Sequence, residues 1–382
     1  MRVGLNLLYL LPGQVGGTQT YAEELLRALV ALDDGNEYLA YVNRESVDLV
    51  LGDGAVELRR CDVTASSRAR RYAAEQLLLP RWCRRDGIDV LHSLGYVGPV
   101  RPGVPHVVTV HDLIYRGFAE HLSVSRRLAL RTFVRGAARG ARAVITDSEA
   151  SRRQLVAELP VPAERIHVVA LAPRSGWSDD PTRVVPDHLG AQGVAAPYVL
   201  ALGSASPSKN LPRLVRAFAR LDHPGLLLVL VGHLPPDGEV AEVIAHEGIA
   251  ERVVTTGYVP DRDLEALLGA ALVLAFPSTY EGFGLPVLDA QRLGVPVVCS
   301  TAASLPEVAG DGAVFAEPTS VDSLAAALAR VVGDPEERDR LVAAGRANVE
   351  QFSWDRTARA TSELYASASA AGGSGDESGT SR

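Results

Sequence analysis

Short apolar runs alternate with segments of helical periodicity along most of the chain, and this alternation begins afresh near residue 198. Apolar runs bounded by turn residues are typical of buried strands, and helical segments between them are typical of βαβ units. The first half of the chain therefore predicts a parallel sheet. Its strands are expected at residues 2–9, 37–42, 56–60, 90–92, 106–110, 143–146 and 166–168.

The second half of the chain predicts a second parallel sheet. We expect its strands at residues 198–202, 226–231, 253–256, 272–275, 297–299 and 313–315. We expect helices between them at residues 211–221, 238–247, 261–269, 286–293 and 321–331. The predicted fold class is α/β, with two Rossmann-like, doubly wound parallel-sheet domains. Because ligands of open α/β sheets bind at the carboxyl ends of the strands, we expect the domains to face each other across a cleft.

Composition places a domain boundary between the two predicted sheets. Residues 172–197 are rich in proline and glycine, so we expect a linker between an N-terminal domain, 1–171, and a C-terminal domain, 198–351. Residues 371–382 are small and polar without periodicity, which predicts a flexible tail. The chain has 382 residues, 47% of them hydrophobic, which is enough for two domains with cores of their own.

Cysteine content and hydropathy indicate the compartment. The three cysteines are widely spaced and odd in number, which argues against a disulfide framework or a metal cluster; they are Cys61, Cys83 and Cys299. The N-terminal residues show no signal-peptide pattern, and no apolar run reaches membrane-spanning length. We therefore expect a protein of the reducing cytoplasm.

The net charge of −8 is unevenly distributed along the chain. Residues 1–180 hold 23 arginines and 21 acidic residues, whereas the remainder holds 15 basic and 25 acidic residues. Arginines cluster in 68–87 and 126–142, both helical by spacing, and solvated helix faces are the simpler interpretation. The alternative is attraction to an anionic membrane surface or an acidic acceptor, because Leu77, Leu78, Leu79 and Trp82 add apolar contact. The overall acidic charge argues against a nucleic-acid partner.

The chain contains a single lysine, Lys209, among 38 basic residues. It lies in the turn between the strand predicted at 198–202 and the helix predicted from 211. Such a turn directs backbone N–H groups and the positive end of the helix dipole toward an anion. An ammonium adds a compact charge that guanidinium copies poorly. Lys209 is therefore our first candidate for a phosphate contact, the alternative being an ordinary solvated position.

The segment 276–298 holds the most specific pattern of the chain. Glu281 precedes Gly282, Phe283 and Gly284, and glycines there let backbone amides approach a ligand closely. Pro286 begins a helix whose N-terminus faces this loop. Asp289 is expected to share that side, so that two carboxylates bracket the N–H donors and suit sugar or ribose hydroxyls; capping of the helix dipole is the structural alternative. Further on, Ser304 and Glu307 are spaced as a capping box.

These segments resemble a known family. The motifs SKN at 208–210, GYVPDRDL at 257–264, PSTYEGFGLPVLD at 277–289 and SLPEVAGDGAVF at 304–315 are similar to those of retaining GT-B glycosyltransferases of family 4, the glycosyl transferases group 1, and of mannosyltransferase-like members in particular. The resemblance covers nearly the whole chain. It implies an acceptor-side domain at 1–171, a nucleotide-sugar-binding domain at 198–351, and a final helix at 352–370 that crosses back to the first domain.

The resemblance also implies roles for individual residues. It assigns catalysis to His111, Lys209 and Glu281, with His111 contacting the donor sugar. Donor binding is implied for Gly16, Gly17, Ser204, Lys209, Gly282, Phe283, Gly284, Leu285 and Asp289. The acceptor side would include Thr18, Tyr21 and Tyr115. The chain departs from the family at Asp289, where glutamate is usual, and at Ser204 and Ser208, where many members place an arginine.

The implied function is transfer of a hexose, with retention, from a nucleotide diphosphate sugar such as GDP-mannose or a UDP- or dTDP-hexose. The acceptor would be a hydroxyl of a glycan, a lipid-linked sugar or a small natural product. We expect no cofactor and no metal, because no acidic DxD pair follows the relevant strand. Alternatives are a nucleotide-sugar 2-epimerase and a non-catalytic nucleotide-sugar-binding protein. A Rossmann dehydrogenase is disfavoured, because no G-x-G-x-x-G follows the first strand. Contact with the inner membrane face is a further expectation.

Overall fold

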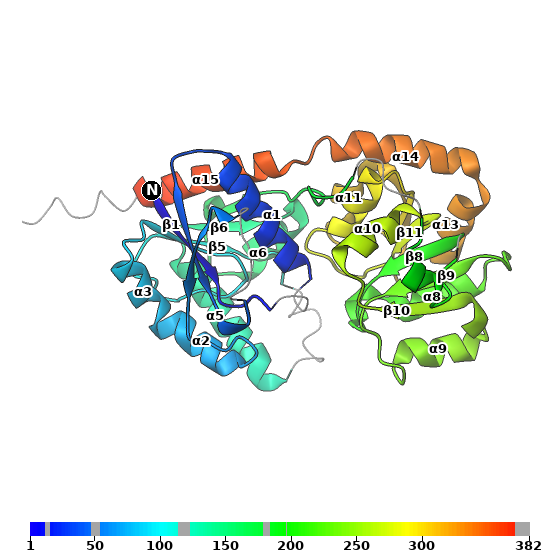
Figure 1. Cartoon of the computed structure of the whole chain (residues 1–382), viewed down its shortest axis with the longest axis horizontal. Coiled ribbons are helices and arrows are strands. Elements are labelled where there is room, and N and C mark those ends of the chain that lie inside the picture. The colour runs from blue at the N-terminus through cyan, green and yellow to red at the C-terminus, as the bar shows by residue number, and fades with distance from the viewer. Residues whose placement is uncertain (12–15, 47–53, 114–122, 179–183, 196, 371–382) are drawn as a thin grey trace, which may run out of the picture. The chain divides into compact units, whose positions relative to one another are not determined.

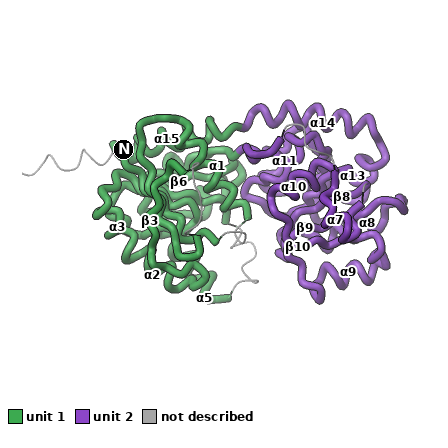
Figure 2. The backbone as a smooth tube through the Cα atoms, viewed as in Figure 1, with its two compact units in different colours: residues 1–171, 353–382 green, residues 172–352 purple. Residues whose placement is uncertain are grey.

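The computed structural model describes residues 1–11, 16–46, 54–113, 123–178, 184–195 and 197–370. The chain divides into two compact units, one of residues 1–171 with the C-terminal segment from residue 353, and one of residues 172–352 (Figure 2). The segment predicted as a linker, 172–197, belongs to the second unit, where Trp177, Leu189 and Val194 join the core. The tail predicted for 371–382 lies outside the described residues.

The first unit contains a seven-stranded parallel sheet in the order β3-β2-β1-β4-β5-β6-β7. Alternation of apolar runs and helices predicted all seven strands to within two residues at each end. The strands are β1 (Arg2–Leu7), β2 (Glu37–Val42), β3 (Glu57–Arg60), β4 (Val90–Ser93), β5 (His106–Thr109), β6 (Ala143–Thr146) and β7 (Ile166–Val168).

Helices cover both faces of this sheet (Figure 1). They are α1 (Gly17–Ala31), α2 (Arg68–Leu77), α3 (Leu79–Arg85), α5 (Val124–Gly140), α6 (Glu149–Glu158) and α15 (Trp354–Ala370). The arginine-rich segment 68–87 forms two helices because Pro80 stands at the start of the second and cannot continue the first. The last helix, α15, packs along α1 within this unit, and the Tyr365 hydroxyl lies 2.7 Å from Nδ1 of His92 in β4.

The second unit contains a six-stranded parallel sheet in the order β10-β9-β8-β11-β12-β13. The strands are β8 (Tyr198–Leu202), β9 (Leu227–Val231), β10 (Val253–Gly257), β11 (Val273–Phe276), β12 (Val297–Ser300) and β13 (Ala313–Ala316). The helices are α7 (Asp187–Gly190), α8 (Leu211–Ala219), α9 (Glu239–Glu247), α10 (Asp261–Gly269), α11 (Leu285–Arg292), α12 (Leu305–Ala309), α13 (Val321–Gly333) and α14 (Pro335–Val349). One apolar cluster fills each face of the sheet.

The strand order of each sheet reverses direction at one point, which decides where a ligand site lies. In the second unit the reversal falls between β8 and β11, so the segments after these strands, 203–210 and 277–284, meet at one edge. In the first unit it falls between β1 and β4, with β5 as the next strand. Ligands of doubly wound sheets bind at such reversal points.

Candidate active site

Lys209 and Glu281, found in separate motifs of the sequence, form an ion pair. Lys209 closes a 3-10 turn at Pro207–Lys209 between β8 and α8, and Glu281 lies between β11 and α11. The Lys209 Nζ is 2.6 Å from Glu281 Oε1 and 5.1 Å from the centroid of the Phe276 ring. The Lys209 side chain remains 26% exposed and that of Glu281 15% exposed. An ammonium held in this way is accessible to a ligand while its position is fixed.

Asn210 ties the turn that carries Lys209 to the loop that carries Glu281. It adopts a left-handed backbone, with φ of 58°, which asparagine tolerates better than most residues. Its Nδ2 donates to the carbonyls of Pro277, at 2.9 Å, and Pro318, at 2.8 Å. The Thr279 amide donates to the Ser208 carbonyl at 2.8 Å. Sequence reasoning missed this role, although an asparagine before a helix was its signal.

The two serines that stand where the family often has arginine differ in exposure. Ser204 is exposed, and its Oγ accepts a hydrogen bond from the Ser206 amide at 3.4 Å. Ser208 is buried, with its Oγ 3.0 Å from that of Ser206. Lys209 is therefore the cationic side chain that this turn presents.

The Ser304 side chain anchors the glycine-containing loop before α11 through hydrogen bonds to the loop backbone. Its Oγ donates toward the carbonyls of Glu281, at 3.0 Å, and Phe283, at 2.7 Å. The capping box predicted for Ser304 is wrong, because the hydroxyl is used by this loop and makes no cap bond to α12. Gly284 has φ of 116°, and a Cβ there would lie 2.8 Å from Leu305, so both backbone and packing require glycine.

Phe283 and Leu285 are buried, at 5% and 7% exposure, within the second unit. The Phe283 ring packs edge-on against Phe352, with ring centroids 6.0 Å apart. Donor contacts predicted at these two positions would therefore involve backbone amides, not side chains. Gly282 precedes them in the same loop, next to Glu281.

Asp289 does not lie open beside Glu281, which corrects the bracketing arrangement predicted from the sequence. It is 1% exposed on α11. Its Oδ1 accepts the Arg174 amide at 3.0 Å, and its Oδ2 forms an ion pair with the Arg174 guanidinium. Arg292 in turn donates to the carbonyls of Arg174 and Trp177. The shorter aspartate side chain thus binds residues 174–177 to α11, a partnership between distant segments that the sequence did not reveal.

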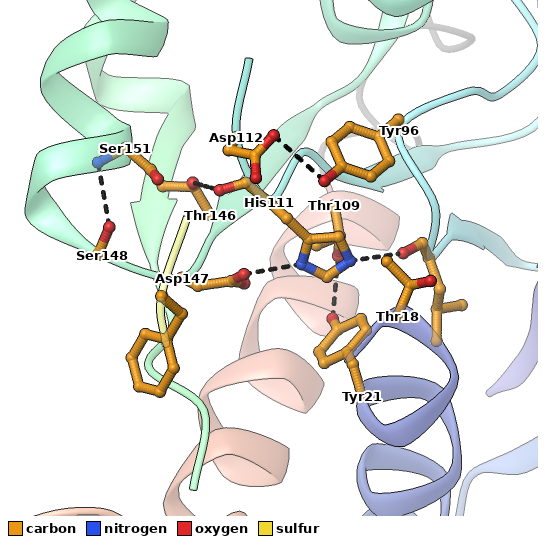
Figure 3. A network of polar contacts seen from close by, with 12 residues as sticks. Thr18, Tyr21, Tyr96, Thr109, His111, Asp112, Thr146, Asp147, Ser148 and Ser151 are labelled. Atoms are coloured by element: carbon orange, nitrogen blue, oxygen red, sulfur yellow. Dashed lines mark hydrogen bonds and ion pairs between the residues drawn. The ribbon is translucent and has the colours of Figure 1, made fainter. Parts of the chain in front are cut away.

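His111 follows β5 and lies in a polar network of the first unit (Figure 3). Its Nδ1 is 2.7 Å from Asp147 Oδ2, and its Nε2 is 3.2 Å from the Leu94 carbonyl oxygen. The rings of Tyr21 and Tyr96 pack edge-on against it, with centroids 4.8 and 5.3 Å away. Burial lowers the pKa of His111, but the charge and hydrogen bond of Asp147 outweigh burial, and the pKa is raised. Asp147 was missed, although a carboxylate directly after a strand was its signal.

The residues predicted around the start of α1 differ in accessibility. Gly16, with φ of 53°, and Gly17 are exposed, and nothing lies within 4 Å of a Cβ built on either. Thr18 is half-buried, and its carbonyl accepts the Tyr9 hydroxyl at 3.3 Å. The acceptor contact predicted for Tyr21 is wrong, because this residue is 1% exposed and its hydroxyl lies 2.9 Å from Thr109 Oγ1. Tyr115 lies outside the described residues.

The described ranges contain neither a cluster of metal-ligating side chains nor a membrane-spanning helix. Within these ranges, no three His, Cys, Asp or Glu side chains gather as a metal site would require. In the same ranges no helix is both long and apolar enough to span a bilayer. Cys61, Cys83 and Cys299 are buried and free.

Sequence comparison links both units to sugar-transferring enzymes. The family model of glycosyl transferases group 1 matches residues 193–348, and that of glycosyltransferase family 4 matches residues 15–171. The O-antigen chain mannosyltransferase B of Escherichia coli is 31% identical over 91% of this chain and 95% of that protein. The MMP alpha-(1->4)-mannosyltransferase of Mycolicibacterium hassiacum is 36% identical over 74% of this chain and 71% of that protein.

Solved structures agree on the fold. Sucrose-phosphate synthase from Thermosynechococcus elongatus superposes with a TM-score of 0.76 at 20% identity, over 97% of this chain and all of that one. HepE from Anabaena, in complex with UDP and glucose, gives 0.74 at 20% identity, over 96% of this chain and all of that one. The motifs, the two parallel sheets and these relatives together establish that the chain belongs to the family 4 glycosyltransferases of the glycosyl transferases group 1, with the GT-B fold.

Proposed function

We propose that the protein is a retaining, metal-independent hexosyltransferase that uses a nucleotide diphosphate sugar. GDP-mannose is the donor we expect first, because two relatives of this protein carry mannosyltransferase names. A UDP- or dTDP-hexose is the second choice, because HepE, which shares the fold, forms a complex with UDP and glucose. The acceptor would be a hydroxyl of a glycan, a lipid-linked sugar or a small natural product.

The observation that supports this proposal best is the Lys209–Glu281 ion pair at the point where strand order reverses in the second unit. When the bond between the sugar and the diphosphate breaks, negative charge develops on the leaving phosphate. Fixed donors aimed at that charge stabilise the transition state more than the ground state. An ammonium has three N–H donors, so Lys209 can hold Glu281 and a phosphate oxygen together.

The proposed reaction balances without a metal or a cofactor. The electron pair of the breaking bond stays on the diphosphate, and the acceptor oxygen attacks the anomeric carbon from the same face. The acceptor proton passes to the departing phosphate oxygen. Glu281 serves here as the partner that orients Lys209, while the donor-sugar contact is assigned to His111.

Mass spectrometry of donor consumption across a panel of nucleotide sugars, with and without sugar acceptors, tests the proposal. We expect a new glycoside together with free nucleotide diphosphate from GDP-mannose, and only when an acceptor is present. Lys209→Ala serves as the matched inactive control. Free nucleotide and altered sugar without any acceptor would indicate the epimerase, and binding without consumption would indicate the non-catalytic protein.

We also propose that α2 and α5 of the first unit bind an anionic membrane surface that presents the acceptor. Exposed apolar side chains lie at the end of α2, at Leu77 and Leu78, and on α5, at Val124 and Leu128. Burial, Arg68 and Arg71 lower the pKa of Arg126, so positive charges are crowded between these helices. In a sedimentation assay, the protein should pellet with phosphatidylglycerol vesicles and should stay in the supernatant with phosphatidylcholine vesicles. Equal binding to both would contradict the proposal.

A further inference from the structure

The hydrogen bonds around His111 fix where its protons are. A backbone carbonyl only accepts, and an ionised carboxylate only accepts. Nε2 faces the Leu94 carbonyl at 3.2 Å and Nδ1 faces the Asp147 carboxylate at 2.7 Å. Both ring nitrogens must therefore donate, which requires the doubly protonated imidazolium. Asp147 is itself 2% exposed, so its charge reaches the ring with little screening by water.

The groups that face the ring from the neighbouring elements leave Asp147 as its principal counter-charge. Tyr21 from α1 and Tyr96 after β4 contribute neutral rings, and burial raises the pKa of Tyr21 well above its usual range. His92 in β4 is uncharged at neutral pH, because burial, together with the nearby His106 and His111, lowers its pKa to about 3. Asp112, which accepts the Tyr96 hydroxyl at 3.2 Å, adds a weaker negative charge.

We propose that Asp147 is a positioning residue that keeps His111 as an oriented imidazolium at neutral pH. The hydrogen bond to Nδ1 sets the ring direction, and the two tyrosine rings restrict its plane. An imidazolium has no lone pair, and both of its N–H groups are already donated to Asp147 and to the Leu94 carbonyl, so His111 acts as a fixed positive charge and cannot act as a general base. The protonation state of His111 does not depend on which reaction the protein catalyses. Its effect on the rate of transfer rests on the proposed function.

Nuclear magnetic resonance of the full chain tests the protonation state without any assay of transfer. Long-range proton–nitrogen spectra distinguish a histidine with two protonated ring nitrogens from one with a single proton, and His111→Gln identifies the His111 signals. We expect both nitrogens of His111 to be protonated at pH 7.5 in the wild-type protein. A single protonated nitrogen at that pH would overturn the proposal. This outcome needs no folded variant of Asp147.

Asp147→Asn removes the charge and keeps the size of the side chain, and Asp112→Asn is its matched control. We expect the His111 titration in Asp147→Asn to move to lower pH by about one unit or more, and in Asp112→Asn to move less. Because the variant loses the imidazolium at a lower pH than wild type does, its kcat/KM relative to wild type should fall between pH 5.5 and 8, by up to about tenfold for each unit of that shift. A constant ratio together with an unchanged titration would show that Asp147 is merely structural. A shifted titration with no transfer by the wild-type protein would fault the proposed function alone.

Discussion

Lys209 is the residue on which the proposed chemistry depends most. We expect Lys209→Ala to lower kcat by about 10² to 10³, the usual cost of losing one donor to a developing oxyanion. Lys209→Arg should be impaired less, because guanidinium keeps the charge but changes the geometry of the donors. Steady-state kinetics measures both, and thermal unfolding controls for the fold. Activity of Lys209→Ala within threefold of wild type would remove the assignment.

Glu281 and Asp289, which look alike in the sequence, should behave differently when replaced. Glu281→Gln removes the charge that orients Lys209, so turnover should fall. It keeps a polar, part-exposed side chain beside Lys209, so stability should change by less than about 1 kcal/mol. Asp289→Ala removes the buried carboxylate that pairs with the largely buried Arg174, and it should cost about 3 to 5 kcal/mol of stability. Urea unfolding and kcat, measured on both variants, separate the two roles. A stable Asp289→Ala with weakened donor binding would restore the ribose contact that the sequence suggested.

Asp289→Glu tests the structural role of Asp289 through the packing around its side chain. The site is closed around the shorter side chain, so an extra methylene should destabilise the protein by about 1 to 3 kcal/mol. The sequence identified Lys209 and Glu281 as candidates because a strand-end turn and a glycine loop have local signatures, and His111 because of the family resemblance. It did not reveal Asp147, Arg174 or the loop contact of Ser304, because each depends on a partner brought close only by tertiary folding.

At the scale of one element, α2 carries a buried acid that the proposed function does not use. Glu75 is fully buried, and Arg71 Nε lies 3.8 Å from its Oε1. Burial raises the pKa of Glu75 to about 7, against the opposing charge of Arg71 and the hydrogen-bonding side chain of Asn6. The unfolded chain therefore ionises this group at a lower pH than the folded protein does. Stability should fall as pH rises from about 4.5 to 7.

Glu75→Gln abolishes this titration and keeps the shape of the side chain. Relative to wild type, the variant should gain up to about 3 kcal/mol of unfolding free energy between pH 4.5 and 8. Urea unfolding at several pH values measures the difference. A difference that does not change with pH would mean that folding does not raise the pKa of Glu75.

The strands were predicted more completely than the helices, although the helices predicted in the second half end within two residues of those observed. Buried strands are short apolar runs between turns, and the sequence displays them directly. Helix α14 was not predicted, because its sequence, PEERDRLVAAGRANV, is mostly charged and small and shows little apolar periodicity. The burial of Tyr21 on α1 was also missed, since the face that a helix presents to its sheet depends on the docking of that helix.

At the scale of the whole molecule, each unit is a complete parallel-sheet domain, and the chain returns to the first unit at its end. Helix α15 packs on α1, and the Thr357 hydroxyl donates to the Ala170 carbonyl at 2.6 Å (Figure 1). The two-sheet architecture was predictable because the βαβ pattern begins twice. The return of the last helix followed from the family resemblance, since no local pattern states which unit a terminal helix joins.

Retaining transfer, with the leaving diphosphate stabilised by the protein and not by a metal, is the property that the proposed function depends on most. Proton magnetic resonance of product formation from GDP-mannose and a mannoside acceptor, in excess EDTA and then with added magnesium or manganese, tests both parts. We predict an α-linked product, formed in EDTA with little loss and accelerated by metal less than about twofold, or under about 0.4 kcal/mol. A β-linked product, or complete inhibition by EDTA reversed by metal, would contradict the proposed function.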